Sequence, residues 1–152
     1  MKDRQLVFRS LDQALRELDR LAGAATLESA TAWSWAQTLV HCAQSIEYSM
    51  TGFPRAKSAV FQQTIGRLAF TSFARRGRMS HDLAQTIPGA PGLGKESNAL
   101  AVQRLRQAVK AFQGWGEPLQ PHFAFGALTK AEYEQAHAMH IANHFSAFDV
   151  AG

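Results

Sequence analysis

Helix-forming segments separated by glycine and proline constrain the fold of this chain more than any other feature. Two of the segments open with a capping box, Ser34 with Gln37 and Thr129 with Glu132, in which side chains and backbone N–H groups bond reciprocally at a helix start. Apolar residues then recur every three or four positions, as they do on one face of a helix. No segment shows the alternation that is typical of strands. The sequence therefore predicts an all-α fold.

The periodic segments predict five helices in a single domain, residues 1–152, without internal repeats. The helices are expected at about residues 3–22, 34–52, 58–76, 96–113 and 129–148. The apolar stripe of the third helix includes Ile65 and Leu68. The segments 77–95 and 115–128 are rich in glycine and proline, so we expect them to lie outside long helices.

Composition excludes several classes of protein. No apolar run approaches the roughly 20 residues that span a bilayer, so no integral membrane protein is expected. The chain starts Met-Lys-Asp-Arg and continues with amphipathic sequence instead of an apolar signal core, which predicts a cytoplasmic location. The single cysteine, Cys42, leaves no intramolecular disulfide and fits a reducing compartment. Because it lies on an apolar stripe, we interpret it as a buried small residue and not as a nucleophile.

The charge of the chain does not indicate a nucleic-acid partner. The net charge of +4 is mild. Arg75, Arg76 and Arg78 form a short basic cluster, whereas a nucleic-acid site needs a wider basic face with base-reading or stacking groups. Cations at the end of a helix complement its dipole, and this explains the cluster.

The last predicted helix carries three of the six histidines, His137, His140 and His144. His140 and His144 lie one turn apart, about 40° around the helix axis, and two imidazoles at this spacing can chelate one ion. Such a pair also arises often by chance, so a metal site needs a third ligand from elsewhere. His81 and His122 fall in the two loops, where we expect ordinary surface roles.

His41, in the second predicted helix, is the candidate third ligand. It shares a helix face with Gln37, Gln44 and Tyr48, opposite an apolar stripe. The periodicity leaves two alternatives open, because this polar face could contact solvent or line a polar cavity.

Two histidine contexts resemble those of a known superfamily. The segment 33–41, WSWAQTLVH, resembles the Trp-Ser start and Leu-x-His of the second helix in DinB-like proteins. The segment 140–144, HIANH, resembles the His-x-x-x-His of their last helix. The segments 37–48 and 123–128 resemble one branch of this DinB/YfiT-like metalloenzyme superfamily, the domain of unknown function 1569. The likeness extends over nearly the whole chain.

This resemblance implies an up-down-down-up four-helix bundle, with an extra helix in the long crossover between the second and third core helices. It also implies that His41, His140 and His144 hold a divalent transition metal, with Zn, Ni and Fe as candidates. Neutral imidazoles suit these ions, whereas Ca²⁺ and Mg²⁺ prefer oxygen ligands.

The resemblance also favours the cavity alternative for the second helix. Gln37, Gln44, Tyr48 and His137 would then surround the metal or contact a substrate. After His144, Phe145-Ser146-Ala147 departs from the polar segment ending in Gln that many relatives carry.

The better-understood relatives are transferases and isomerases that depend on glutathione or another low-molecular-weight thiol. We therefore expect a metal-dependent transferase or hydrolase with a small-molecule substrate, and neither a nucleic-acid nor a membrane partner. A homodimer is a further candidate assembly. The alternative to the enzyme is a non-catalytic helical module that binds a small molecule or dimerises. Histidines that converge beside a cavity would favour the enzyme, and histidines packed without a cavity would favour the module.

Overall fold

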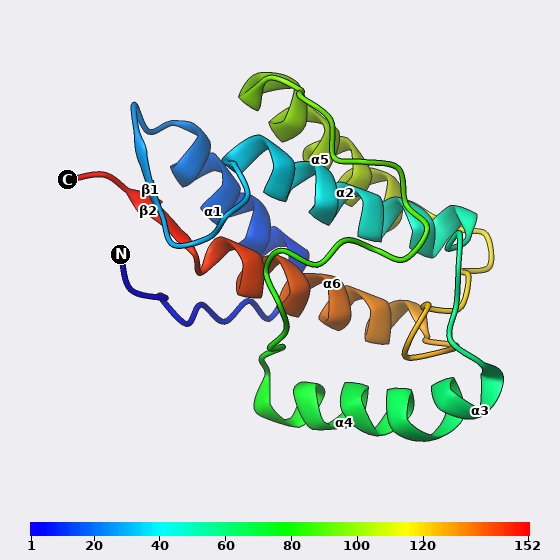
Figure 1. Ribbon diagram of the computed structural model, residues 1–152. Coiled ribbons are helices and arrows are strands. Elements are labelled where there is room, and N and C mark those ends of the chain that lie inside the picture. Colours follow the sequence, from blue (N-terminus) through cyan, green and yellow to red (C-terminus); the bar gives the residue numbers. More distant parts are fainter.

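The computed structural model covers residues 1–152 and is mainly helical (Figure 1). Slightly more than half of the residues lie in helices, as the all-α prediction requires. The elements in chain order are α1 (Leu11–Ala22), β1 (Leu27–Ser29), α2 (Trp35–Thr51), α3 (Ala59–Phe61), the π-helical turn η1 (Gln62–Gly66), α4 (Arg67–Arg76), α5 (Asn98–Gln113), α6 (Lys130–Phe145) and β2 (Phe148–Val150).

Four helices, α1, α2, α5 and α6, pack around a shared core. α2 lies along α5, α6 contacts both α1 and α2, and α1 also contacts α5. α2 and α5 run in the same direction, whereas α1 and α6 run in the opposite direction (Figure 1). Each helix contributes fully buried aliphatic side chains, among them Leu18, Leu39, Leu105 and Ile141. Burying one side chain of this size stabilises a fold by about 1.5–3 kcal/mol.

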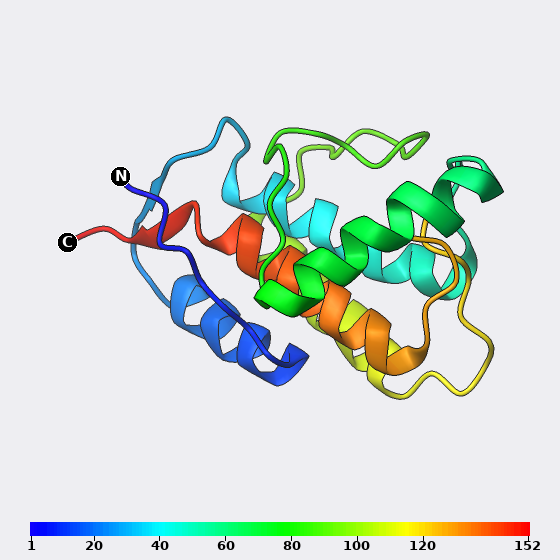
Figure 2. The same ribbon diagram turned by 90° about the horizontal axis from the view of Figure 1, so that it is seen from below.

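α3, η1 and α4 follow one another without a break and lie outside the four packed helices (Figure 2). They span the helix predicted at residues 58–76. A Cβ atom at Gly66 would lie 1.8 Å from the carbonyl oxygen of Ala124, so only glycine permits this approach. Ile65 and Leu68 are 60% and 70% exposed, because the helical segment contacts the rest of the protein through the side that bears Gly66 and Phe70.

The N-terminal segment does not form the helix predicted from residue 3. α1 begins at Leu11 after the N-cap Ser10, and the preceding residues have no regular secondary structure. The backbone N–H of Arg4 bonds to the carbonyl of Ser146 (3.0 Å), and that of Leu6 bonds to the Ser146 hydroxyl (2.8 Å). These tertiary hydrogen bonds replace the helical ones, which explains why the local pattern was misleading.

The C-terminus also differs from the prediction. α6 ends at Phe145 instead of continuing to residue 148, and β2 pairs antiparallel with β1, Leu27 opposite Val150. The prediction of a chain without strands was therefore wrong. Two three-residue strands about 120 residues apart carry no periodicity that a local pattern could reveal.

Both capping boxes are present where the sequence predicted them. The Ser34 hydroxyl accepts from the N–H of Gln37 (3.1 Å), and the Gln37 amide oxygen accepts from the N–H of Ser34 (3.0 Å). Thr129 and Glu132 make the same two bonds, at 3.1 and 3.0 Å. The start of each histidine-bearing helix is thus fixed locally.

The two segments expected outside long helices are irregular, as predicted. Gly77, which ends α4, has a φ of 70°, the left-handed conformation common after a helix C-terminus. None of the helices has both the length and the apolar character that crossing a membrane requires.

Thr129→Ala should lower the free energy of unfolding by about 0.5–2 kcal/mol, because it leaves an N–H group at the start of α6 without its acceptor. Urea unfolding followed by circular dichroism measures this change. Ser72→Ala is the matched control, since Ser72 is exposed in the middle of α4 and should change stability by less than about 0.5 kcal/mol. Equal effects of the two substitutions would contradict the role of the capping box.

Candidate metal centre

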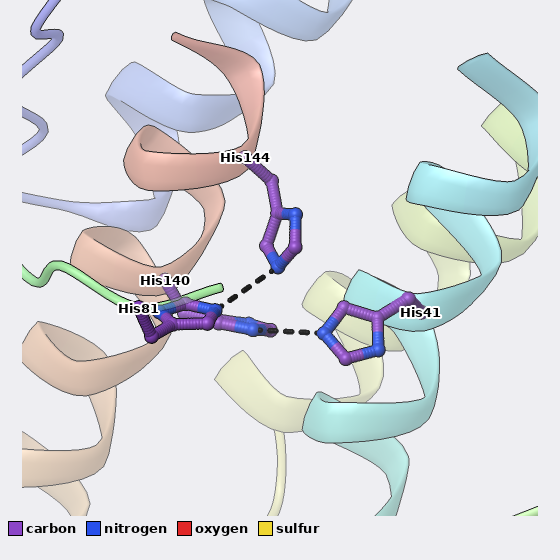
Figure 3. Close-up of side chains that lie close together, drawn as sticks. All are labelled: His41, His81, His140 and His144. Atoms are coloured by element: carbon purple, nitrogen blue, oxygen red, sulfur yellow. Dashed lines mark hydrogen bonds between the residues drawn. The ribbon is translucent and has the colours of Figure 1, made fainter. Parts of the chain in front are cut away.

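α2 and α6 bring the three predicted ligands together in the interior of the protein. His41 projects from α2, and His140 and His144 project from consecutive turns of α6 (Figure 3). The Nε2 atoms of His41 and His140 are 3.1 Å apart. His41 and Gln44 are each 3% exposed, so this part of the polar face of α2 contacts the protein interior, whereas Gln37 and Tyr48 are partly exposed.

A fourth histidine, His81, joins the cluster from the irregular segment after α4 (Figure 3). Its Nε2 lies 3.2 Å from that of His144, and its ring stacks on His140 with centroids 5.2 Å apart. The side-chain amide of Asn143 approaches the other ring nitrogen of His81 at 3.1 Å. The expectation of a surface role for His81 was wrong, because a loop residue has no helical period that could place it in the interior.

One ligand atom from each of the four histidines lies within 4.8 Å of the other three. No carboxylate or thiol belongs to this group. Four nitrogen donors around one point fit a transition metal such as Zn, Ni or Fe, whereas Ca²⁺ and Mg²⁺ require oxygen donors.

The surroundings keep these imidazoles neutral. Burial lowers the pKa of His41 to about 4, and repulsion from a charged His81 adds to the effect. Burial, followed by repulsion among the clustered rings, lowers the pKa values of His140 and His144 well below the ordinary value. Burial also lowers the pKa of His81, although Asp82 opposes this shift. A neutral imidazole has a free nitrogen lone pair at neutral pH, and this is the form that binds a metal.

Trp33 lies against the cluster. Its indole ring is nearly parallel to the ring of His144, at 8° with centroids 6.0 Å apart, and its centroid is 5.0 Å from that of His41. Trp33 directly precedes the N-cap Ser34, so it lies next to the backbone position that the capping box of α2 fixes. The Nδ1 atom of His41 is buried without a hydrogen-bond partner, so packing and not a hydrogen bond at Nδ1 orients this ring.

The predicted surrounding residues have different roles in the structure. The Gln37 amide oxygen is used in the capping box, and the Gln44 amide donates to the carbonyl of Pro91 (3.3 Å). The ring of Tyr48 packs on Phe53 with centroids 5.6 Å apart. None of these three side chains lines the cavity that adjoins the histidine cluster.

His137 is buried one turn before the cluster and outside it. The Ser49 hydroxyl donates its proton to the carbonyl of Ile46, so it accepts a hydrogen bond from Nε2 of His137 (3.1 Å). That nitrogen is therefore protonated and occupied by Ser49.

A cavity of about 220 Å³ adjoins the cluster. Three of the clustered histidines, His41, His81 and His140, form part of its wall, together with His137. The apolar part of the wall includes Phe73, Met79, Ile87, Phe123 and Phe125. His122 also lines the cavity, which corrects the expectation that it has an ordinary surface role. A ligand in this cavity would lie beside the clustered imidazoles.

Comparison with known families supports the resemblance carried by residues 37–48 and 123–128. A family model described as "Protein of unknown function (DUF1569)" matches residues 1–150. The chain belongs to the DUF1569 family. No curated protein and no solved structure matches it.

The one cysteine of this DUF1569 member takes no part in the centre. Cys42 is fully buried beside His41 in sequence, but it neither belongs to the cluster nor lines the cavity. Burial raises the pKa of its thiol, which suppresses the reactive thiolate. The prediction of a small buried residue is confirmed.

Acid should destabilise the fold of this DUF1569 member. Burial lowers the pKa of His41 to about 4 and those of His122 and His137 to about 3, whereas an unfolded histidine titrates near pH 6.5. As the pH falls from about 6.5 to about 4, the unfolded chain binds more protons than the folded chain. The free energy of unfolding should then fall by up to about 1.4 kcal/mol per pH unit for each histidine.

Urea unfolding in chelator-containing buffer at about pH 7.5, 6 and 5 measures this dependence. A midpoint that stays constant over this range would contradict the neutral state of the buried histidines. The His122→Asn variant should show a shallower dependence, because one of the histidines with a lowered pKa is removed.

Proposed function

We propose that this protein is a metal-dependent enzyme of the DinB-like superfamily that acts on a small molecule. His41, His140 and His144 would hold a divalent transition metal, with Zn, Ni and Fe as candidates. The observation that carries the proposal is the convergence of four neutral imidazoles within 4.8 Å of one another, beside a cavity of about 220 Å³.

The arrangement of the helices supports the DinB-like placement. The directions of α1, α2, α5 and α6 correspond to an up-down-down-up order (Figure 1). α3, η1 and α4 lie in the long connection between the second and third of these helices. The candidate ligands come from the second and the last helix, as the resemblance implies.

A bound ion would act as a Lewis acid and lower the pKa of a thiol or a water molecule at the site. The chain itself supplies the donors and their surroundings. The helices fix His41, His140 and His144, Trp33 covers His144, and burial keeps the rings unprotonated.

His81 gives the proposed centre a fourth donor. Catalytic zinc sites use three protein ligands and keep one position open, whereas structural sites are closed by four. His81 differs from the other three because it lies on an irregular segment and not on a helix. Its displacement would open a position next to the cavity that it lines.

The three helix-borne histidines should be essential for metal binding, and His81 should not. After loading with Co²⁺ and desalting, the wild type should retain about one equivalent of metal, and His140→Ala and His144→Ala should lose it, because three fixed donors define the site. His81→Ala should retain the metal. Elemental analysis gives the content, and His122→Asn is the control, since His122 lies outside the cluster.

Retention of metal by both α6 variants would contradict this ligand set. Circular dichroism of each variant shows whether the loss of metal reflects loss of folding. If His81→Ala also loses the metal, all four histidines are required, and the non-catalytic alternative gains support.

We further propose that the enzyme uses glutathione or a similar small thiol, as the resemblance implies. The cavity contains no cysteine, so a thiol would have to come from a second small molecule. Electrophilic substrates should turn over faster with glutathione and metal together than with either alone. Turnover that persists in His144→Ala after treatment with a chelator would show that the reaction does not depend on the histidine cluster.

The number of donors favours one alternative, a non-catalytic module in which all four histidines close the coordination sphere. Visible spectra of the Co²⁺-loaded protein separate the two functions. Added 2-mercaptoethanol should change the spectrum if a position can open for a thiol. An unchanged spectrum would favour the closed, non-catalytic site.

A further inference from the structure

The ring of His122 has a tautomer fixed by the backbone. Its Nδ1 atom accepts hydrogen bonds from the N–H groups of Ala124 and Phe125, each at 3.1 Å. A neutral imidazole has one acceptor nitrogen and one N–H group. Since both backbone groups can only donate, Nδ1 carries no proton and Nε2 carries it.

Burial supports this neutral form, because it lowers the pKa of His122 to about 3. The ring stacks on Phe125, with centroids 4.3 Å apart and an angle of 13° between the rings, and Phe53 lies 5.2 Å away. An apolar environment of this kind disfavours a charged imidazolium.

The Nε2–H group of His122 has no hydrogen-bond partner within the protein. Unlike the indole N–H of Trp115, which also lacks a partner, it is not completely buried. His122 lines the cavity beside the histidine cluster. We infer that the free N–H donor faces this cavity and can bond to a molecule inside it.

The segment that carries this donor is held in place from several directions. His122 and Gly126 exchange two backbone hydrogen bonds, at 2.8 and 3.0 Å. The N–H of Lys57 bonds to the carbonyl of Phe123 (2.8 Å), and Ala124 lies against Gly66 of the π-helical turn. A donor held in this way loses little entropy when a ligand binds.

The lining of the cavity indicates which kind of acceptor it suits. None of the lining residues is a lysine, an arginine or a carboxylate. Burying a charged ligand among apolar groups without a partner is costly, whereas a neutral oxygen needs only a hydrogen-bond donor. A metal held by the clustered histidines could pair with an anionic group, but the side chains of the wall offer a charged group no partner. At His122, whose free polar group is an N–H donor, a neutral oxygen such as that of a carbonyl therefore fits best.

We propose that this cavity binds a small, largely apolar molecule with a neutral oxygen that accepts a hydrogen bond from Nε2–H of His122. The apolar side chains Phe73, Met79 and Ile87 contact the rest of the molecule, which lies beside His41 and His140. This inference rests on the proposed function, because it takes the cavity as the substrate pocket of the enzyme.

Two probes of nearly equal shape test the donor. Cyclohexanone carries an oxygen where methylenecyclohexane carries a CH₂ group, and both are small enough for the cavity. Dissociation constants are measured by NMR titration of chelator-treated protein and of the zinc-loaded protein. His122→Asn places an amide oxygen near the position of Nδ1, which preserves the acceptor of the loop, and removes the donor at Nε2.

The dissociation constant of cyclohexanone should rise about tenfold in His122→Asn, the value of one hydrogen bond. That of methylenecyclohexane should change by less than about twofold, because it makes no such bond. An equal change for the two probes would overturn the proposal, as would wild-type protein that binds neither. His122→Gln, which loses the acceptor of the loop, should unfold at a lower temperature than His122→Asn.

Long-range ¹H–¹⁵N NMR spectra of the wild type report the tautomer directly. We expect the Nε2–H form of His122 throughout about pH 5–8, where an ordinary histidine would titrate. An Nδ1–H form would overturn the proposal. Failure of metal binding would contradict the proposed function and leave these results unaffected, because they are obtained without metal as well.

Discussion

The close approach of α2 and α6 is the constraint on which the histidine centre depends. It brings the Nε2 atoms of His41 and His140 to 3.1 Å from each other within the core. At this distance two charged rings would repel strongly, and burial penalises the charged form further, so the cluster is stable only when it is neutral or holds a cation. Burial therefore has two effects: it lowers the stability of the fold in acid, and it keeps the imidazole nitrogens unprotonated, the form that can bind a metal.

The long connection between α2 and α5 completes the histidine cluster to which α2 and α6 contribute three members. Its helical part, α3 to α4, packs Gly66 against Ala124 and thereby fixes one wall of the cavity. Its irregular part carries His81 to the cluster. The cluster thus combines three histidines on helices with a fourth on an irregular segment. A metal held by all four would have a closed coordination sphere, whereas one held by the three helical histidines would keep a position open.

Local signals in the sequence predicted the starts of four of the five helical segments to within two residues. The capping boxes at Ser34 and Thr129 lie where the structure places them, because all their hydrogen bonds are between residues three apart. The N-terminal residues were wrongly predicted as helical, since Arg4 and Leu6 bond to Ser146, which lies at the other end of the chain. Predictions of helix bounds from local patterns were thus right where the hydrogen-bond partners are local and wrong where the partners are distant in the sequence.

The sequence by itself determined the helices, the family and the pairing of His140 with His144, because one helical turn sets their spacing. It left open whether the polar face of α2 contacts solvent, and only the packing of α2 against α6 decided that His41 is buried. The positions of His81 and His122 were likewise decided by tertiary structure. Both residues lie on irregular segments, whose path depends on hydrogen bonds and packing with parts of the chain that no local pattern can identify.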